Sequence, residues 1–300
     1  MSKDKKQPAT SDLPGASVPR GTPFMPPSED EQVSAIDQFK EKILKEYDRL
    51  GLDDTFSFCC EPGVPCFNKC CGDVNIFLTP YDVLRMKNAL NMSSSDFLDQ
   101  YTMLPIEKNM KYPVVMFKLD ESQPDKPCQL VGADGCTIYE DRPWPCRMYP
   151  LGMASPKEGE GEEDFYFLMK EDVCEGFTDQ REWTVREWLE DQGMAKYDEF
   201  GRLYKELTLH DFFKGGKSLS PERMNLFHMA CYDLDTFRRF IFESTFRKRF
   251  DVEEETLARI KEDDEELLRF AFRWVKFACF GEPTIEMRPE AMGPLSTPPR

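Results

Sequence analysis

The sequence predicts an α+β protein in which a small, irregular, cysteine-rich domain with short strands precedes a mostly helical C-terminal region. Nine of the 11 cysteines lie between Cys59 and Cys174, where short β-prone runs alternate with turns, and helical periodicity dominates after residue 184. The 300 residues suffice for one large domain or two smaller ones. We predict four parts: a disordered leader at 1–27, a cysteine-cluster domain at 28–178, a helical region at 179–280 and a flexible tail at 281–300.

The N-terminal part combines a polar leader with one helix. Residues 1–27 are rich in Pro, Ser, Gly and Lys, which is typical of disorder. Ser28 and Glu31 have the spacing of a capping box. The apolar side chains behind them share one helical stripe, formed by Val33, Ile36, Ile43, Leu44 and Tyr47. We therefore predict a helix over about residues 29–50.

The cysteine-rich part contains short elements with clear boundary signals. Thr79-Pro80, with Asp82 at the capping-box position, predicts a helix from Pro80 to Leu90, and Ser93 opens a second one ending at Tyr101. Strands are expected in the β-branched and aromatic runs 74–78 and 112–119, in two short runs within 129–139 around a Gly-Ala-Asp-Gly turn, and in 151–154 and 165–169, which could pair across an acidic loop.

Helical patterns fill the C-terminal part. Thr184 with Glu187 caps a first helical segment, in which Gly193 predicts a break. Ser220-Pro221 opens a segment to about Phe250, and a further one covers 251–280. We expect the aromatic stretch 237–250 to form helical core, its basic residues to pair with the acidic segment after it, and the carboxylates at 263–266 to form a solvated helix face.

Charge and hydropathy exclude several classes of function. The net charge of −17 repels phosphate backbones, so we expect no nucleic-acid partner. The N-terminus has no apolar core of a secretory signal, and no run approaches 18 apolar residues, so we expect no membrane span. We therefore predict a cytoplasmic protein whose thiols stay reduced, and the odd cysteine count also argues against a disulfide framework.

The clustered cysteines therefore predict a metal-binding domain. Only two histidines are present, His210 and His228, and both lie outside the cluster, so any site there is nearly all-thiolate. Eight cysteines divide into two four-thiolate sites: Cys60, Cys66, Cys70, Cys71, Cys128, Cys136, Cys146 and Cys174. Vicinal cysteines such as Cys70 and Cys71 project in divergent directions, which suits two neighbouring centres. Cys231 and Cys279 lie in apolar helical segments and are expected to be structural.

Two kinds of metal centre fit these ligands. Thiolates select zinc, iron–sulfur clusters or copper(I). The paired C-x2-C knuckles of zinc ribbons are absent, and so is the ferredoxin run of cysteines. We favour iron–sulfur clusters as the cofactor and keep zinc as the alternative.

The same motifs resemble those of the YkgJ-like cysteine-cluster family. They are the run CCEPGVPCFNKCC, the segment LTPYDVLRMK, the segment GCTIYEDRPWPCRMYPLG and the final CEG. The resemblance covers about residues 56–178, and it implies a zinc- or iron-chelating domain with the eight cysteines above as ligands. The family includes flagellin lysine N-methylases, which implies possible S-adenosylmethionine chemistry. The first cysteine gap here is longer than in the family's compact C-x2-C-x2-C-C form.

The sequence leaves the activity open. Three hypotheses remain: a metal-dependent modifying enzyme such as a protein-lysine methylase, a redox module, and a structural zinc protein that contacts a protein partner through its helical region. Arg142 and Arg147 either bind an anionic substrate or order a loop through its carbonyl groups. No catalytic residue and no oligomeric state are predicted.

Overall fold

The computed structural model describes residues 48–105, 110–154, 165–178 and 181–289. Three of the predictions concern other parts of the chain. The leader at 1–27, nearly all of the helix at 29–50 and the acidic loop before residue 165 lie outside the described residues. The described part combines short strands with helices that concentrate toward the C-terminus, which confirms the α+β class.

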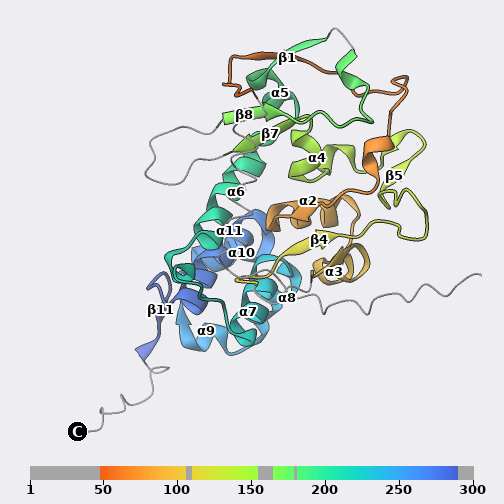
Figure 1. Cartoon of the computed structure of the whole chain (residues 1–300). Helices are drawn as coiled ribbons and strands as arrows, with labels where there is room; N and C mark the ends of the chain where they lie inside the picture. The colour runs from red at the N-terminus through yellow and green to blue at the C-terminus, as the bar shows by residue number, and fades with distance from the viewer. Residues whose placement is uncertain (1–47, 106–109, 155–164, 179–180, 290–300) are drawn as a thin grey trace, which may run out of the picture. The chain divides into compact units, whose positions relative to one another are not determined.

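The strands form small antiparallel sheets rather than one large one (Figure 1). The largest sheet in the described part has the order β2-β4-β3, with β2 at Phe77–Leu78, β4 at Val115–Phe117 and β3 at Thr102–Met103. The other sheets are pairs: β1 (Thr55–Ser57) with β9 (Glu182–Thr184), β5 (Val131–Gly132) with β6 (Gly135–Cys136), β7 (Leu151–Ala154) with β8 (Phe165–Leu168), and β10 (Phe250–Asp251) with β11 (Glu286–Met287). The predicted pairing of the 151–154 and 165–169 runs is confirmed, with Leu151 opposite Leu168.

The predicted caps fix the helices of the cysteine-rich part. Helix α2 spans Pro80–Ala89, and Thr79 and Asp82 form its capping box. Ser93 caps α3 (Ser94–Tyr101). A short helix α4 covers Trp144–Met148, and single 3-10 turns cover Lys69–Cys71, Tyr139–Asp141 and Gly176–Thr178.

The C-terminal helices are shorter than the sequence pattern suggested. They are α5 (Val185–Asp191), α6 (Met194–Thr208), α7 (Pro221–Cys231), α8 (Leu234–Glu243), α9 (Phe246–Arg249), α10 (Glu254–Glu262) and α11 (Asp264–Val275), which a π turn extends to Phe280. The break at Gly193 is confirmed, with φ at 61°. The two long helical segments are each divided at an aspartate: Asp233 accepts from the Thr236 N–H, and Asp263 accepts from two N–H groups of α11.

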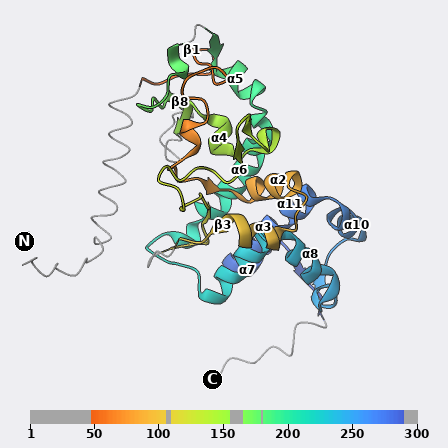
Figure 2. The same ribbon diagram turned by 90° about the vertical axis from the view of Figure 1, so that its right-hand side faces the viewer.

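One hydrophobic core joins the cysteine-rich and helical parts. Residues 49–300 group as one compact unit, and the main core combines α2 and the β2-β4-β3 sheet with α6, α7, α8 and α11. Figure 2 shows α2 beside α11. Tyr81 of α2 stacks on Phe200 of α6 with ring centroids 4.4 Å apart. A second, smaller core surrounds Phe58, Leu151 and Trp188. The predicted boundary at residue 178 stays a prediction, and packing across it is continuous.

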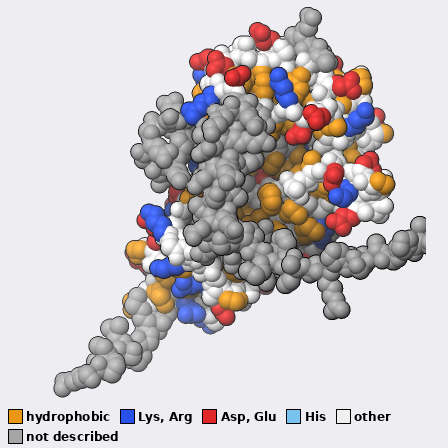
Figure 3. Space-filling view, in the orientation of Figure 1, with side chains coloured by type: hydrophobic (Ala, Val, Ile, Leu, Met, Phe, Trp, Pro, Cys, Tyr) orange, Lys and Arg blue, Asp and Glu red, His pale blue; other side chains and the backbone are white. Residues whose placement is uncertain are grey.

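The aromatic stretch 237–250 is confirmed as core. Phe237, Ile241, Phe246 and Phe250 are all buried. Two of the basic side chains in this stretch pair with later acids as predicted, Arg238 with Asp264 and Arg247 with Glu254. Acidic and basic side chains also lie interspersed over the described surface drawn in Figure 3.

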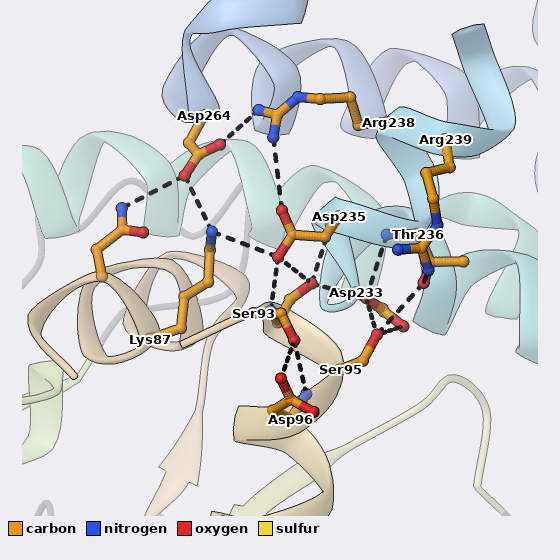
Figure 4. A network of polar contacts seen from close by, with 12 residues as sticks. Lys87, Ser93, Ser95, Asp96, Asp233, Asp235, Thr236, Arg238, Arg239 and Asp264 are labelled. Atoms are coloured by element: carbon orange, nitrogen blue, oxygen red, sulfur yellow. Dashed lines mark hydrogen bonds and ion pairs between the residues drawn. The ribbon is translucent and has the colours of Figure 1, made fainter. Parts of the chain in front are cut away.

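A polar network links α2 and α3 to α8 and α11 (Figure 4). The Lys87 ammonium is nearly buried and lies 3.2 Å from Asp264 and 3.6 Å from Asp235. Asp235 also accepts from the Ser94 N–H at 2.6 Å. Two of the carboxylates at 263–266 are therefore not solvated as predicted, since Asp264 neutralises a buried lysine and Glu265 accepts from the Tyr81 hydroxyl, whereas Asp263 is exposed. Loss of the lysine would leave two carboxylates partly buried without that cation.

We predict that Lys87→Met lowers the free energy of unfolding by about 3 kcal/mol, which is the lower limit of the usual cost of breaking a buried ion pair. The cost stays low because Arg238 still contacts both carboxylates. Chemical denaturation measures the change. Lys196→Met is the matched control, because that lysine is half exposed and pairs with Glu199 and Glu265; its cost should stay below about 1 kcal/mol. Equal losses in the two variants would contradict the structural role given to Lys87.

Candidate metal centre

The loop that carries Cys70 and Cys71 docks on the segment before Cys128 through its backbone. The Cys128 N–H donates to the Cys71 carbonyl at 2.6 Å, and the Asp73 N–H donates to the Lys126 carbonyl at 3.1 Å. Between them, Gly72 approaches so closely that an added Cβ would lie 2.4 Å from the Asp125 carbonyl oxygen. Gly72 is therefore required for this contact, a role that its position between cysteines and a turn did not reveal.

Four of the predicted ligands form a first set around Cys60. The set consists of Cys60, Cys66, Cys70 and Cys174, and the adjacent Cys59 thiol also acts on Cys60. Burial raises the pKa of Cys60 to about 11, and the neighbouring thiols of the set add to the rise. Residue 174 is more than 100 positions beyond Cys66, yet the Glu175 N–H donates to the Cys66 sulfur at 3.1 Å. This bond joins the two ends of the cysteine-rich sequence.

The other four predicted ligands form a second set around Cys146. The set consists of Cys71, Cys128, Cys136 and Cys146. Cys146 keeps some exposed surface, but its thiol is largely surrounded by protein. This desolvation raises the pKa of Cys146 to about 12, and the Cys128 and Cys136 thiols add smaller contributions. The short β5-β6 hairpin brings Cys136 close to Cys128, whose sulfur accepts from the Leu130 N–H at 3.4 Å.

The vicinal cysteines connect the two sets. Cys70 lies with the first set and Cys71 with the second, although their side chains do not diverge as predicted. The thiols contact each other: a hydrogen bond between them lowers the pKa of Cys70 to about 7 and raises that of Cys71. The two sets are therefore neighbours that meet at one dipeptide.

The thiols are gathered without being in ligand geometry. Across residues 48–105, 110–154, 165–178 and 181–289, no three Cys, His, Asp or Glu side chains converge on a point that could hold a metal ion. All eleven cysteines are free thiols, in keeping with the expected absence of disulfides in this part of the chain. Cys231 and Cys279 are fully buried in the helical core and away from both sets, as predicted.

Asp82 holds the Cys146 helix against α2. Its carboxylate is completely buried and accepts from the Trp144 N–H at 2.7 Å, at the first residue of α4. The same carboxylate accepts from the Thr79 N–H and hydroxyl. Burial raises the pKa of Asp82 to about 6, although these bonds oppose the rise. The sequence indicated only its capping role, because Trp144 is distant along the chain.

Arg142 and Arg147 order the loop rather than face a ligand. Both side chains are buried. Arg147 donates to three backbone carbonyls, those of Glu140, Arg142 and Gln192. Arg142 donates to the Tyr139 carbonyl and the Gln192 side chain. Of the two roles predicted for these arginines, hydrogen bonding to carbonyls is confirmed.

The donor set fits an all-thiolate metal centre, and one side chain beside it supports the fit. The Tyr149 hydroxyl is buried and makes no hydrogen bond of acceptable geometry within the described part of the chain. Burial and then the adjacent Cys174 thiol raise the pKa of Tyr149, so this hydroxyl stays protonated. A buried donor next to a cysteine sulfur is suited to a thiolate, which accepts hydrogen bonds more strongly than a thiol.

Other candidates for a site are weaker. A groove of about 730 Å³ lies beside the Lys87 network, and its lining carries four basic and three acidic side chains, so it selects no single ligand charge. His210 bonds to Glu282 at 2.7 Å and stacks on Phe280. Burial lowers the pKa of His228. Neither histidine has a thiol of the two cysteine sets among these contacts.

We predict that Arg147→Lys lowers the free energy of unfolding by about 2–3 kcal/mol, because one ammonium cannot satisfy three buried carbonyls in the fork geometry of a guanidinium. Denaturation curves of the metal-free chain measure this. Arg186→Lys, at a half-exposed arginine paired with Asp53, should change stability by less than about 1 kcal/mol. An unchanged stability in Arg147→Lys would refute the loop-ordering role.

Asp82 also predicts a pH dependence of stability. Its pKa rises from 3.8 to about 6 on folding, so between these values the folded chain binds a proton that the unfolded chain has released. Its contribution to the free energy of unfolding is therefore greatest below about pH 4 and falls as the pH rises to about 6. Across this pH range the free energy of unfolding of the metal-free wild-type chain should decrease by on the order of 2–3 kcal/mol because of Asp82. Denaturation curves of Asp82→Asn should lack this decrease.

An exposed carboxylate provides the control of opposite sign. The Ser122 hydroxyl, the Gln123 amide and the Ser122 N–H lower the pKa of Asp120, so its contribution increases with pH and is complete above its ordinary range. Asp120→Asn should leave the profile between pH 4 and pH 6 as in the wild type. If Asp82→Asn also left it unchanged, the protonation of Asp82 in the folded chain would be disproved.

Comparison with known proteins gives one match. Residues 59–175 match the model of the CxxCxxCC family, described as a "Putative zinc- or iron-chelating domain". No curated protein and no solved structure matches the chain. The description names metal chelation and no reaction, so the methylase and redox hypotheses stay predictions. The matched segment begins at Cys59, ends just after Cys174 and contains both cysteine sets, so the similarity to this zinc- or iron-chelating family covers the whole cysteine cluster.

Proposed function

We propose that this chain is a metal-binding protein in which the two cysteine sets hold two adjacent all-thiolate centres, with iron–sulfur clusters as the favoured occupants. The observation that carries the proposal is the gathering of eight thiols from distant segments into two groups of four. Four thiolates are the usual ligand number for zinc and for iron–sulfur clusters alike.

The surroundings of the thiols support charged sulfur ligands. Backbone N–H groups point at the sulfurs of Cys66 and Cys128, one in each set. Such bonds stabilise metal-bound thiolates and adjust the properties of the metal. The segments that carry the thiols are held mainly by backbone contacts such as the one between Cys71 and Cys128.

The two possible occupants would do different things. When bound, an iron–sulfur cluster supplies electron transfer, whereas zinc held by four thiolates supplies structural stability. We favour iron–sulfur because the ligands are all soft thiolates and the sequence lacks zinc knuckles. No helix among the described residues has the length and apolarity needed to cross a bilayer. We propose in addition that the protein is cytoplasmic, where its thiols stay reduced.

The first test is the metal and acid-labile sulfide content of the full chain purified without oxygen. The proposal predicts iron with matching sulfide and a brown absorbance. A result of zinc without sulfide would show that zinc, and not an iron–sulfur cluster, occupies the thiolate centres. Protein that binds neither metal after reconstitution would refute the function itself.

Single substitutions test the division into two sets. Cys70→Ser should remove the metal of the first set and Cys136→Ser that of the second, each leaving about half of the bound metal, because each substitution takes one of four thiolates from its set. Metal analysis with denaturation measures both effects. Cys231→Ser, at a buried cysteine of the helical core, is the matched control and should keep the full metal content. Complete loss in both cysteine variants would contradict independent centres.

A further inference from the structure

The Tyr149 hydroxyl is one of four buried side-chain polar groups that lack a hydrogen-bond partner within the described residues, and its neighbour is a thiol. The others are the Tyr197 hydroxyl, one nitrogen of Arg269 and the Trp274 indole N–H. The Arg147 guanidinium lies over the Tyr197 ring, with its Cζ atom 4.6 Å from the ring centroid. Tyr149 instead packs with Cys174 against the smaller core.

Tyr149 is held in place from both sides. Its ring packs edge-on against Phe58, with centroids 5.7 Å apart, and its N–H donates to the Pro145 carbonyl of α4 at 3.2 Å. Phe58 also packs against Phe177, three residues after Cys174, at 5.2 Å. One buried ring therefore fixes both the tyrosine and the segment that carries the cysteine. The hydroxyl cannot leave the thiol without repacking Phe58.

A neutral thiol is a poor acceptor for this donor. Thiol sulfur accepts hydrogen bonds weakly, whereas a thiolate forms a charge-assisted bond of about twice the strength of a neutral one. A buried hydroxyl without an acceptor is unfavourable for the fold. The arrangement therefore makes sense if Cys174 functions as a thiolate.

We propose that Tyr149 is a positioning residue of the first metal centre, where its hydroxyl donates a hydrogen bond to the metal-bound sulfur of Cys174. The inference rests on the proposed function, because it requires the first cysteine set to bind a metal. The bond orients the Cys174 side chain toward the other three sulfurs and withdraws charge from its sulfur. The bond acts on the first centre alone.

Cobalt(II) titration of the metal-free full chain tests this inference. Cobalt binds four-thiolate sites whether their natural occupant is zinc or iron, and its charge-transfer absorption reports thiolate ligation. Wild type should bind two equivalents. Tyr149→Phe keeps the ring and removes the hydroxyl, so it should weaken one equivalent by about 10- to 100-fold and shift its charge-transfer band. Tyr197→Phe removes the other buried, unpartnered hydroxyl and should behave as wild type.

A double-substitution cycle identifies the partner. In a Cys174→Ala background, Tyr149→Phe should have no further effect on cobalt binding or on the absorption spectrum, since the acceptor is gone. The metal-free Tyr149→Phe chain should be at least as stable as wild type, because it loses only an unpartnered group. A variant that failed to fold would give the hydroxyl a structural role and overturn the inference.

The remaining outcomes separate the inference from the proposed function. Wild-type protein without thiolate-to-cobalt absorption would refute the function and the inference together. Two normal equivalents in wild type and in Tyr149→Phe would overturn the inference alone. Equal weakening in Tyr149→Phe and Tyr197→Phe would also overturn it, because the effect would then follow from loss of any buried hydroxyl.

Discussion

The buried carboxylate of Asp82 links the core of this protein to its cysteine-rich part. It belongs to α2, which packs in the main core, and it accepts the N–H of Trp144, where the helix that carries Cys146 begins. A fully buried carboxylate is costly, and its cost is offset by the hydrogen bonds that it accepts and by nearby Arg147. That arginine in turn donates to the Glu140 and Arg142 carbonyls of the same loop and to the Gln192 carbonyl at the end of α5. Displacing Asp82 would release α4, and with it the place of Cys146 in the second set.

The thiol region is built differently from the rest of the molecule. Its strands are two to four residues long, and its segments meet through backbone hydrogen bonds and through close glycine contacts at Gly72 and Gly176. Such a region buries little apolar area of its own and depends on α2 and the helical core beneath it. Backbone docking of these segments brings the thiols together in two groups. This arrangement is suited to ligands that assemble around an ion.

The two sets are adjacent and have different surroundings. The first lies against the smaller aromatic core, with the Tyr149 hydroxyl beside Cys174. The second lies against the polar elements around Asp82 and Arg142, whose charges act on Cys146. Metal centres in these two environments would differ in potential and in lability, because hydrogen bonds and nearby charge modify a thiolate-bound metal. The Cys70–Cys71 dipeptide would place them close enough to influence each other.

The sequence by itself determined the local features of this protein. The capping signals at Thr79, Ser93 and Thr184 predicted helix starts correctly, because a cap depends on residues within one turn. The cysteine spacing named the eight candidate ligands and the family. The aspartate caps at residues 233 and 263 were missed, since the surrounding apolar periodicity continues through both breaks. The acidic run at 263–266 was misread because its partner Lys87 lies far away along the chain.

Only the tertiary structure decided which thiols lie together and what surrounds them. The bond between Glu175 and Cys66 and the contact between Tyr149 and Cys174 join segments that no local pattern connects. The role of Arg147 likewise depended on finding three carbonyls from two parts of the chain around one guanidinium. The physical reason is that metal ligation and burial of charge are long-range in sequence. Residue type and spacing limit the possible partners, and the packing of the core selects among them.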